Sequence, residues 1–261
     1  FSIRYGLRLS MFQNIGKETF FLFDENHECY DQVDYASGDI FNTEFNLEPR
    51  LAAMYQLNEF SSIKASYGRT VQYAQLASNA SAGIPFDMWF PTSPNIKPQK
   101  CDQFSIGYFR NFLNNEIETS VEFFYKNIHN VIDFADNATL IGNLYIDGEV
   151  RAGKGYAYGA EFLLRKNFGD FSGWISYTYS KSMRKIPGIN YDREYVSPYD
   201  RPHNLSIVLN YAFNKRFDVS ASWVYNTGQS VTYPCGKYTV DGVTYAVYNG
   251  RNNSRHPDYH R

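Results

Sequence analysis

Hydrophobic and polar residues alternate strictly over the first eleven positions of the chain. The apolar positions are Phe1, Ile3, Tyr5, Leu7, Leu9 and Met11, and the polar positions are Ser2, Arg4, Gly6, Arg8 and Ser10. A period of two predicts a β-strand whose side chains point to two different faces. The two arginines exclude a dry core on the polar face. That face would meet solvent in a soluble sandwich or line a watery lumen in a transmembrane barrel, and one strand does not decide between them.

The same alternation returns in pairs of segments that are joined by short polar turns. The pairs are 47–57 with 63–68, 103–108 with 117–126, 156–165 with 171–180, and 204–213 with 217–226. The turns are 58–60, 113–115, 167–170 and 214–216. Each pair predicts a tight antiparallel hairpin. The segments extend to about 11 residues or a little more, and about 9–11 tilted residues are enough to cross a bilayer.

Long polar connections separate these hairpins. They cover residues 13–43, 76–100, 130–155, 183–201 and 228–256. Short and long links therefore alternate, which puts the short turns at one rim of a meander and the long loops at the other. Loops of this length are uncommon in compact soluble domains, whereas short periplasmic turns and long extracellular loops are typical of outer-membrane barrels. The pattern predicts an all-β, antiparallel fragment of a transmembrane β-barrel, with about ten up-and-down strands.

Composition supports this prediction. Aromatic residues make up 18% of the chain, with 23 Tyr and 21 Phe, yet the mean hydropathy is −0.47. Strands with one apolar and one wet face combine these properties. Several rings lie near predicted strand ends, where aromatic girdles meet the membrane interfaces: Tyr55, Tyr125, Tyr156, Phe171 and Phe213. A net charge of −2 gives no basic excess, so nucleic acid is not expected as a partner.

One long link contains a further hairpin signal. Asp241 and Gly242 are flanked by alternating residues from Tyr238 to Tyr245. An Asp-Gly pair in this setting favours a type I′ turn, because both of its residues tolerate positive φ. We expect an extra two-stranded ribbon on the long-loop side.

Catalytic and metal-binding motifs are missing from the sequence. It contains no G-x-S-x-G, H-E-x-x-H, P-loop or G-x-G-x-x-G arrangement. We therefore predict that the chain is not an enzyme, and we assign no catalytic residue, metal ligand or cofactor. The segment 200–203 holds acidic and basic groups, but we interpret it as the beginning of a strand. Cys29, Cys101 and Cys235 are either unpaired or include one bridge between loops, because an odd number cannot all pair within the chain.

Two groups of residues are candidates for contacts. Phe86, Trp89 and Phe90 lie in a long loop, where they either contact a ligand or pack against neighbouring loops. A set of charged residues lies on the polar faces of predicted strands and is expected to face the lumen: Arg4, Arg8, Arg50, Lys64, Glu118, Glu122, Lys126, Glu161 and Arg165. Enclosed charges need partners or water, so we expect these residues to pair with each other or with a plug domain inside the barrel.

Several short strings resemble strand-edge motifs of TonB-dependent outer-membrane receptors, especially those abundant in Bacteroidota. The strings are 46–50 (NLEPR), 95–99 (NIKPQ), 157–162 (AYGAEF), 176–180 (SYTYS), 199–204 (YDRPHN) and 257–261 (PDYHR). The resemblance covers nearly the whole chain. It implies a barrel of about 22 strands, an N-terminal plug domain, and coupling to the TonB–ExbB–ExbD complex of the inner membrane. Residues 1–261 would then be part of the C-terminal half of the barrel, and the plug and final strands would lie outside this chain.

The resemblance implies active uptake of a scarce nutrient across the outer membrane of a Gram-negative bacterium. The ligand would be a siderophore, cobalamin, a glycan or a peptide, and the sequence does not choose among them. Outer-membrane lipid would surround the barrel, and a surface lipoprotein is a possible further partner. The alternatives are a passive porin, a barrel used for adhesion, and a soluble β-sandwich that binds a ligand. A preceding plug and TonB box would favour import over a passive pore.

Overall fold

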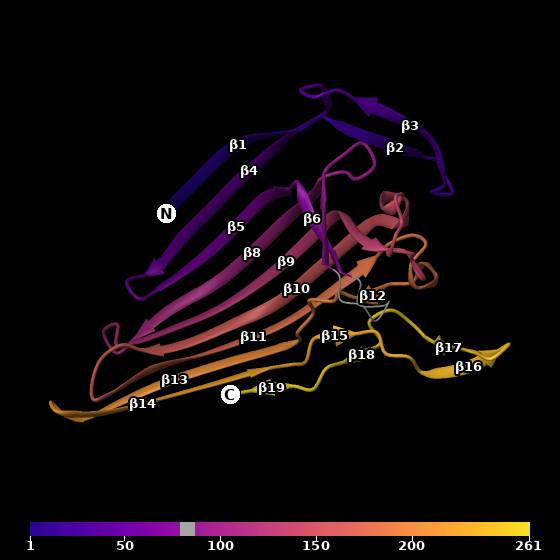
Figure 1. Ribbon diagram of the computed structural model, residues 1–261. Coiled ribbons are helices and arrows are strands. Elements are labelled where there is room, and N and C mark those ends of the chain that lie inside the picture. The colour runs from indigo at the N-terminus through magenta and orange to yellow at the C-terminus, as the bar shows by residue number, and fades with distance from the viewer. Residues whose placement is uncertain (79–86) are drawn as a thin grey trace.

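The structure is a computed structural model that describes residues 1–78 and 87–261 (Figure 1). Within these residues, one antiparallel sheet contains 11 strands, and its path runs β1-β4-β5-β8-β9-β10-β11-β13-β14-β19, with β12 paired to β11. The strands of the path are β1 (Ser2–Ile15), β4 (Ile40–Asn58), β5 (Ser61–Gln72), β8 (Gln99–Phe112), β9 (Ile117–Phe134), β10 (Val150–Lys166), β11 (Phe171–Lys185), β13 (His203–Asn214), β14 (Phe217–Asn226) and β19 (Tyr259–His260). The predicted all-β meander is confirmed, and the sheet is open between β1 and β19.

The four short turns lie together at one edge of the sheet (Figure 1). They connect β4 to β5, β8 to β9, β10 to β11, and β13 to β14, as predicted. The turn after β8 uses Asn114 and Asn115, whose φ angles are 51° and 71°. Asparagine tolerates this left-handed region better than most residues. We call this edge the short-turn edge and the opposite edge the long-loop edge.

The long links contain more regular structure than the sequence predicts. They form the two-stranded pairs β2 (Glu18–Phe23) with β3 (Cys29–Tyr35), β6 (Ala74–Ser78) with β7 (Asp87–Pro91), β15 (Ser230–Val231) with β18 (Ser254–Arg255), and β16 (Gly236–Val240) with β17 (Val243–Val247). Within residues 1–78 and 87–261, these links also contain two 3₁₀ helices, η1 (Ile146–Glu149) and η2 (Asn190–Asp192), and the short strand β12 (Tyr195–Val196). The β16–β17 ribbon is the predicted hairpin, and its turn residues Asp241 and Gly242 have φ angles of 50° and 79°.

The predicted strand boundaries at the long-loop edge are wrong. β4 contains 19 residues and β9 contains 18, so both extend well into segments that the sequence pattern assigns to loops. The alternation of apolar and polar residues weakens there, whereas the backbone ladder continues. Apolar and polar residues alternate only where one face of a strand is apolar and the other is polar. Backbone hydrogen bonds between strands form whether or not the two faces differ in polarity.

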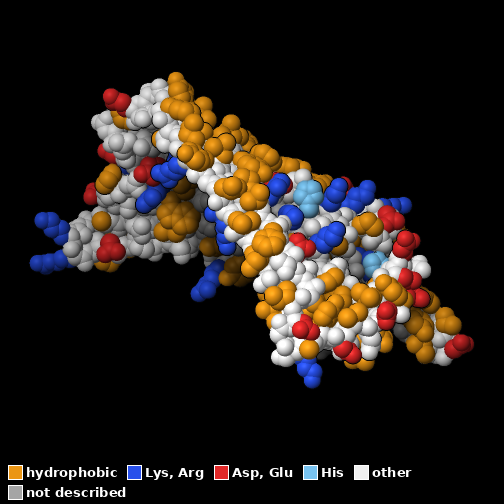
Figure 2. Space-filling model, turned by 90° about the horizontal axis from the view of Figure 1, so that it is seen from above, with side chains coloured by type: hydrophobic (Ala, Val, Ile, Leu, Met, Phe, Trp, Pro, Cys, Tyr) orange, Lys and Arg blue, Asp and Glu red, His pale blue; other side chains and the backbone are white. Residues whose placement is uncertain are grey.

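The register sorts the side chains onto two faces. Residues that are opposite each other in an antiparallel ladder point to the same side, and one such row joins Ala65, Ile106, Phe123 and Ala160. Ile106 and Phe123 are 53% and 54% exposed, although both are hydrophobic. We call their side of the sheet the apolar face and the other side the polar face. Figure 2 shows hydrophobic side chains gathered in a band along the sheet.

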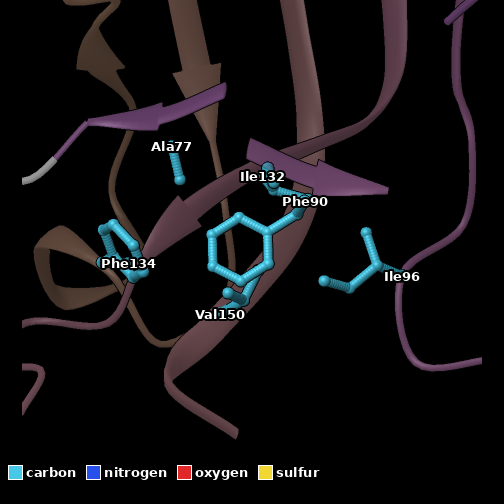
Figure 3. Packing of buried hydrophobic residues seen from close by; sticks show 6 residues of the cluster. All are labelled: Ala77, Phe90, Ile96, Ile132, Phe134 and Val150. Atoms are coloured by element: carbon cyan, nitrogen blue, oxygen red, sulfur yellow. The ribbon is translucent and has the colours of Figure 1, made fainter. Parts of the chain in front are cut away.

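A small hydrophobic core lies at the long-loop edge and not between layers of the sheet. It consists of Ala77, Phe90, Ile96, Ile132, Phe134 and Val150 (Figure 3). The rings of Phe90 and Phe134 meet edge to face, with centroids 5.7 Å apart. A second cluster joins Val131, Ile186, Ile189 and Tyr195. The long links are therefore packed against the ends of β9 and β10.

No helix in the described part of the chain is long and apolar enough to cross a membrane.

Gly159 on the polar face of β10 is required by close packing against both neighbouring strands, β9 and β11. A Cβ atom there would lie 2.7 Å from Cζ of Phe124 and would also strike the carbonyl oxygen of Tyr179. We predict that Gly159→Ala lowers the free energy of unfolding by about 1–3 kcal/mol, because the backbone oxygen cannot move freely. Denaturant unfolding of the full-length protein, followed by tryptophan fluorescence, measures this change.

Gly68→Ala is the matched control. Gly68 also lies in a strand, but a Cβ atom there would have nothing within 4 Å. This variant should be as stable as the unmodified protein or slightly more stable, because alanine restricts the unfolded chain more than glycine does. Equal stability of the two variants would contradict the packing argument.

Candidate functional site

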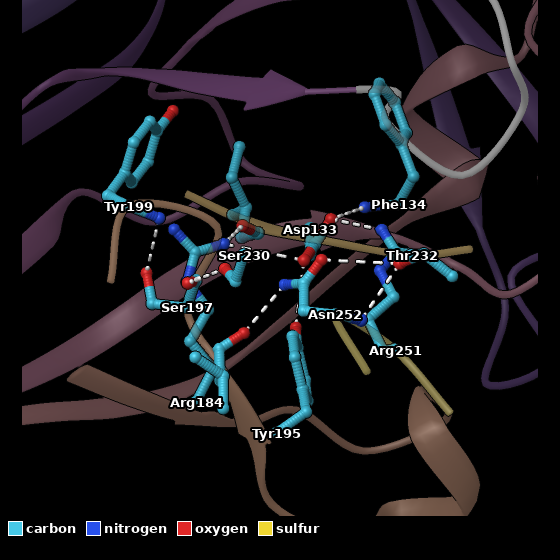
Figure 4. A network of polar contacts seen from close by, with 12 residues as sticks. Asp133, Phe134, Arg184, Tyr195, Ser197, Tyr199, Ser230, Thr232, Arg251 and Asn252 are labelled. Carbon is cyan, nitrogen blue, oxygen red and sulfur yellow. Dashed lines mark hydrogen bonds and ion pairs between the residues drawn. The ribbon is translucent and has the colours of Figure 1, made fainter. Parts of the chain in front are cut away.

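A buried cluster of charged and polar side chains connects several long links (Figure 4). We call it the Asp133 cluster, and it consists of Asp133, Arg184, Tyr195 and Arg251. The Asp133 Oδ1 atom accepts hydrogen bonds from Arg251 Nη2 at 2.6 Å and from the backbone N–H of Phe134 at 2.9 Å. Its Oδ2 atom accepts from the Tyr195 hydroxyl at 2.9 Å and from Arg184 Nη1 at 3.5 Å. Both oxygens of the carboxylate therefore accept hydrogen bonds.

A β-bulge places Asp133 in this cluster. The register between β9 and β10 shifts between Gly153 and Lys154, and Asn130 on β9 is the extra residue, with a φ of 56°. The Asn130 side-chain amide donates to the carbonyl oxygen of Pro98 at 2.9 Å, which fixes the bulge. A single inserted residue reverses the faces of the strand beyond it. Asp133 therefore points to the polar face. Arg184 on β11 points to the same face, because it is opposite Gly155, a polar-face position of β10.

The Asp133 cluster is largely shielded from water. The side chains of Asp133 and Arg251 are each only 6% exposed. Burial, followed by the negative charge of Asp133, raises the pKa of the Tyr195 hydroxyl, so that this hydroxyl stays protonated and donates to the carboxylate. Removing one partner from a buried charge network leaves the others without compensation. The cluster thus holds together segments that are far apart in the sequence.

A second ion pair fixes the beginning of β13. Arg255 pairs with the carboxylate of Asp200 and donates from Nη1 to the Asp200 carbonyl oxygen at 2.9 Å. The other carboxylate oxygen of Asp200 accepts the backbone N–H of Ser182 at 2.6 Å. The sequence interpretation of residues 200–203 as the start of a strand is confirmed, since β13 begins at His203.

Two cavities flank the Asp133 cluster. The first, of about 470 Å³, is lined by residues of the β9–β10 link, η2 and the β16–β17 ribbon, including Phe134, Asp136, Asn190, Tyr238, Tyr248 and Arg251. Arg251 Nη1 lies 3.5 Å from the Asp136 carboxylate and makes no hydrogen bond within the described residues. Aromatic rings, an amide and a guanidinium group can bind a polar ligand by stacking and hydrogen bonding. Nothing in this arrangement resembles a nucleophile with its base.

The second cavity is lined in part by Trp89, one of the predicted contact residues. Its volume is about 380 Å³, and Trp89, Arg184 and Tyr199 are among its lining residues. Trp89 is 65% exposed on β7, whereas Phe90 is 4% exposed and belongs to the hydrophobic core. Phe86 lies outside the described residues. Ligand contact at these positions stays a prediction, and of the two that the structure describes, Trp89 has the accessible ring.

The charged residues that were expected to face a lumen all share the polar face. The register places them there: Arg4, Arg8, Arg50, Lys64, Glu118, Glu122, Lys126, Glu161 and Arg165. Some of them are paired, because Arg8 and Arg50 each lie 3.8 Å from Glu48, and Arg165 lies 3.8 Å from Glu118. That this face lines a lumen stays a prediction.

Sequence reasoning did not identify the Asp133 cluster. Asp133 and Arg251 are 118 positions apart, and neither belongs to a recognisable motif. The described residues contain no group of three or more His, Cys, Asp or Glu side chains that could hold a metal ion. Cys29, Cys101 and Cys235 are unpaired in this structure.

Comparison with known proteins identifies a family. The sequence model described as "TonB dependent receptor-like, beta-barrel" matches residues 1–261. A search of curated protein sequences finds no match.

Several solved structures share the fold. The ferric-catecholate import receptor Fiu from E. coli K12 is 18% identical, with a TM-score of 0.56 over 99% of this chain and 34% of that chain. The FrpB iron transporter from Neisseria meningitidis is 14% identical, with a TM-score of 0.56 over 99% of this chain and 34% of that chain. The ferripyoverdine receptor of Pseudomonas aeruginosa is 17% identical, with a TM-score of 0.55 over 89% of this chain and 27% of that chain. The chain thus spans about a third or less of the length of these proteins.

Replacing the central carboxylate should loosen the long links. We predict that Asp133→Asn destabilises the local structure by about 3 kcal/mol or more, because Arg184 and Arg251 would remain buried without a full countercharge. Hydrogen exchange in the full-length protein should accelerate in β12 and in the β15–β18 pair. Glu118→Gln is the control, since the Glu118–Arg165 pair is partly exposed, with its charged atoms 3.8 Å apart, and should contribute less than about 1 kcal/mol. Similar exchange in the two variants would contradict a central role for Asp133.

Proposed function

Because the chain belongs to the TonB-dependent receptor β-barrel family, we propose that it is part of an outer-membrane transporter that imports a scarce nutrient by TonB-dependent active transport. The observation that carries this proposal is the family match over residues 1–261. The fold is consistent with it, since related receptors superpose on nearly the whole chain. Receptor and transport roles in the outer membrane are those of the family, whereas the ligand and the energy coupling are proposed for this protein.

The apolar face supports a position in the membrane. The hydrophobic band on this face runs along β9 from Ile117 to Tyr125. This length is about 27 Å along the strand and about 20 Å across a membrane at the usual strand tilt. Phe104, Tyr125 and Tyr158 form a row at the margin of this band that is nearer to the long-loop edge. Rings of this kind are enriched where hydrocarbon meets the polar interface. An exposed hydrophobic surface of this extent would make a soluble protein aggregate.

The long-loop edge supports ligand capture. The Asp133 cluster and the two hydrophobic clusters hold the links in a defined shape, and cavities open on both sides of the Asp133 cluster. Such concave surfaces with aromatic rings and a few polar groups are suited to small ligands. We propose that Trp89 and the residues around Arg251 contribute to binding. Siderophores, cobalamin, glycans and peptides are the ligand classes to test.

We further propose that residues 1–261 form part of a larger barrel domain. Unpaired strand edges are not stable in hydrocarbon, so other strands would have to complete the sheet beside β1 and β19. A plug domain inside the barrel would provide partners for the charged residues of the polar face, such as Glu122 and Glu161, which are opposite each other in the register. The TonB–ExbB–ExbD complex would supply energy, and co-purification would test for a surface lipoprotein.

A charged residue on the apolar face should disturb insertion into the membrane. We predict that the full-length protein fractionates with the outer membrane and changes its gel mobility on boiling, as folded barrels do. Ile106→Arg should destabilise the folded form by about 2–4 kcal/mol and reduce its amount, because arginine would face lipid. Ser105→Arg, on the neighbouring polar face, is the control and should cost less than about 1 kcal/mol, since only the hydroxyl contact with Ser66 is lost. A soluble protein without a mobility shift would disprove the transporter proposal.

Active import should depend on the energy-coupling complex. We predict that cells producing the full-length protein accumulate one of four probes, a labelled ferric siderophore, cobalamin, oligosaccharide or peptide, only when TonB is present. Trp89→Ala should reduce accumulation at low ligand concentration, whereas Tyr30→Ala, another exposed ring on a different loop strand, should not. Accumulation that is independent of TonB would favour a passive porin. If the cells accumulate none of the four probes and the protein instead binds host or surface molecules, a role in adhesion would be favoured.

A further inference from the structure

Four basic side chains form a transverse row across neighbouring strands at the long-loop edge. Lys100 on β8 is opposite His129 on β9, His129 is opposite Lys154 on β10, and Lys154 is opposite Lys185 on β11. Adjacent strands lie about 4.8 Å apart, so the row is about 14 Å long. We call these four residues the basic row. Figure 2 shows Lys, Arg and His side chains gathered beside the hydrophobic band, toward the loop end of the molecule.

The basic row belongs to the apolar face. His129 lies an even number of residues after Tyr125 on β9, and Lys100 lies an even number before Phe104 on β8, without an intervening register shift. Along β8, β9 and β10 the basic row lies four positions from the row formed by Phe104, Tyr125 and Tyr158. Four positions correspond to about 13 Å along a strand and about 10 Å across the membrane. The polar region of a bilayer adds roughly 5–8 Å on each side of the hydrocarbon. Long lysine side chains at this height reach the head groups.

The lysines of the row form no salt bridge within the described residues. Within the described residues, no carboxylate oxygen lies within 4.0 Å of Lys100, Lys154 or Lys185. Like charges directly opposite each other in a ladder are destabilising. The row therefore concentrates positive charge that an external anion would compensate.

Acidic residues close to the row are already engaged elsewhere. Asp102 accepts hydrogen bonds from Arg69 at 2.8 and 3.0 Å and from the Tyr67 hydroxyl at 2.7 Å. Glu194 accepts the Tyr156 hydroxyl at 3.1 Å. The His129 Nε2 atom lies 3.2 Å from the side-chain amide of Asn127. None of these contacts neutralises the lysines.

We propose that the basic row binds the phosphate groups of a membrane lipid with a multiply phosphorylated head group. Two features favour such a lipid over a free anion. The row is about three strand spacings long, which exceeds the size of one phosphate. On the side of the row that faces the short-turn edge, the rings of Phe104, Tyr125 and Tyr158 offer apolar surface to acyl chains. These residues are 51%, 46% and 40% exposed. This inference rests on the proposed location in the outer membrane and does not depend on transport.

The test measures lipid binding by the full-length protein, purified and delipidated in detergent. The probes are diphosphorylated lipid A and the same lipid with both phosphates removed. The unmodified protein should bind the diphosphorylated probe more tightly, and the difference should shrink as salt increases. The triple variant K100Q/K154Q/K185Q should lose roughly 100-fold in affinity, because each basic residue near an anionic head group contributes about fivefold.

The control variant K215Q/R216Q/K237Q removes the same number of charges from exposed positions away from the row. It should bind lipid A as the unmodified protein does. The boiling-dependent mobility shift of each variant reports whether it is folded, and probe accumulation reports transport separately. The proposal is wrong if folded K100Q/K154Q/K185Q binds normally, if both triple variants lose affinity equally, or if removing the lipid phosphates has no effect. Complete displacement by millimolar inorganic phosphate would indicate a free-anion site and would also overturn it.

Discussion

Register along the antiparallel ladder is the constraint on which the other properties of this sheet depend. Side chains alternate with a period of two, so a slip of one residue would exchange the apolar and polar faces of a whole strand. The pairing from β1 through β11 keeps hydrophobic residues in step over many strands, and the charged residues on the other side stay in step with them. Short turns at one edge maintain this alignment from hairpin to hairpin.

The two edges of the sheet are stabilised by different means. At the short-turn edge, the backbone conformations of a few turn residues are enough to hold neighbouring strands in register. At the long-loop edge, contacts between distant segments take over, and a buried carboxylate with two guanidinium groups is central among them. Such a network contributes less to overall stability than to the choice of one loop arrangement, because desolvation offsets much of the attraction between charges. A defined loop arrangement is what a binding surface needs.

The sequence predicted the parts of the fold that depend on local patterns. The hairpins, their turns and the β16–β17 ribbon followed from alternation and from Asn and Asp-Gly signals. The ends of β4 and β9 could not be predicted, because their ladders continue after the contrast between faces fades. The Asp133 cluster was also inaccessible, since its members come from separate links and its geometry depends on a bulge. Phe90 and Trp89 are adjacent in sequence, and only packing distinguishes the buried ring from the exposed one.

The bulge at Asn130 makes the number of residues in β9 as important as their identity. Beyond it, Val131 and Asp133 face the same side as Gly153 and Arg151. If β9 instead continued its regular pairing through Asn130, the Asp133 carboxylate would turn toward the apolar face without any change of residue type. A two-residue insertion or deletion that leaves the bulge in place would therefore preserve the faces, whereas a one-residue change of that kind would exchange them. Any grafted link that includes the adjoining ends of β9 and β10 would have to keep this parity for a carboxylate at position 133 to reach Arg184 and Arg251.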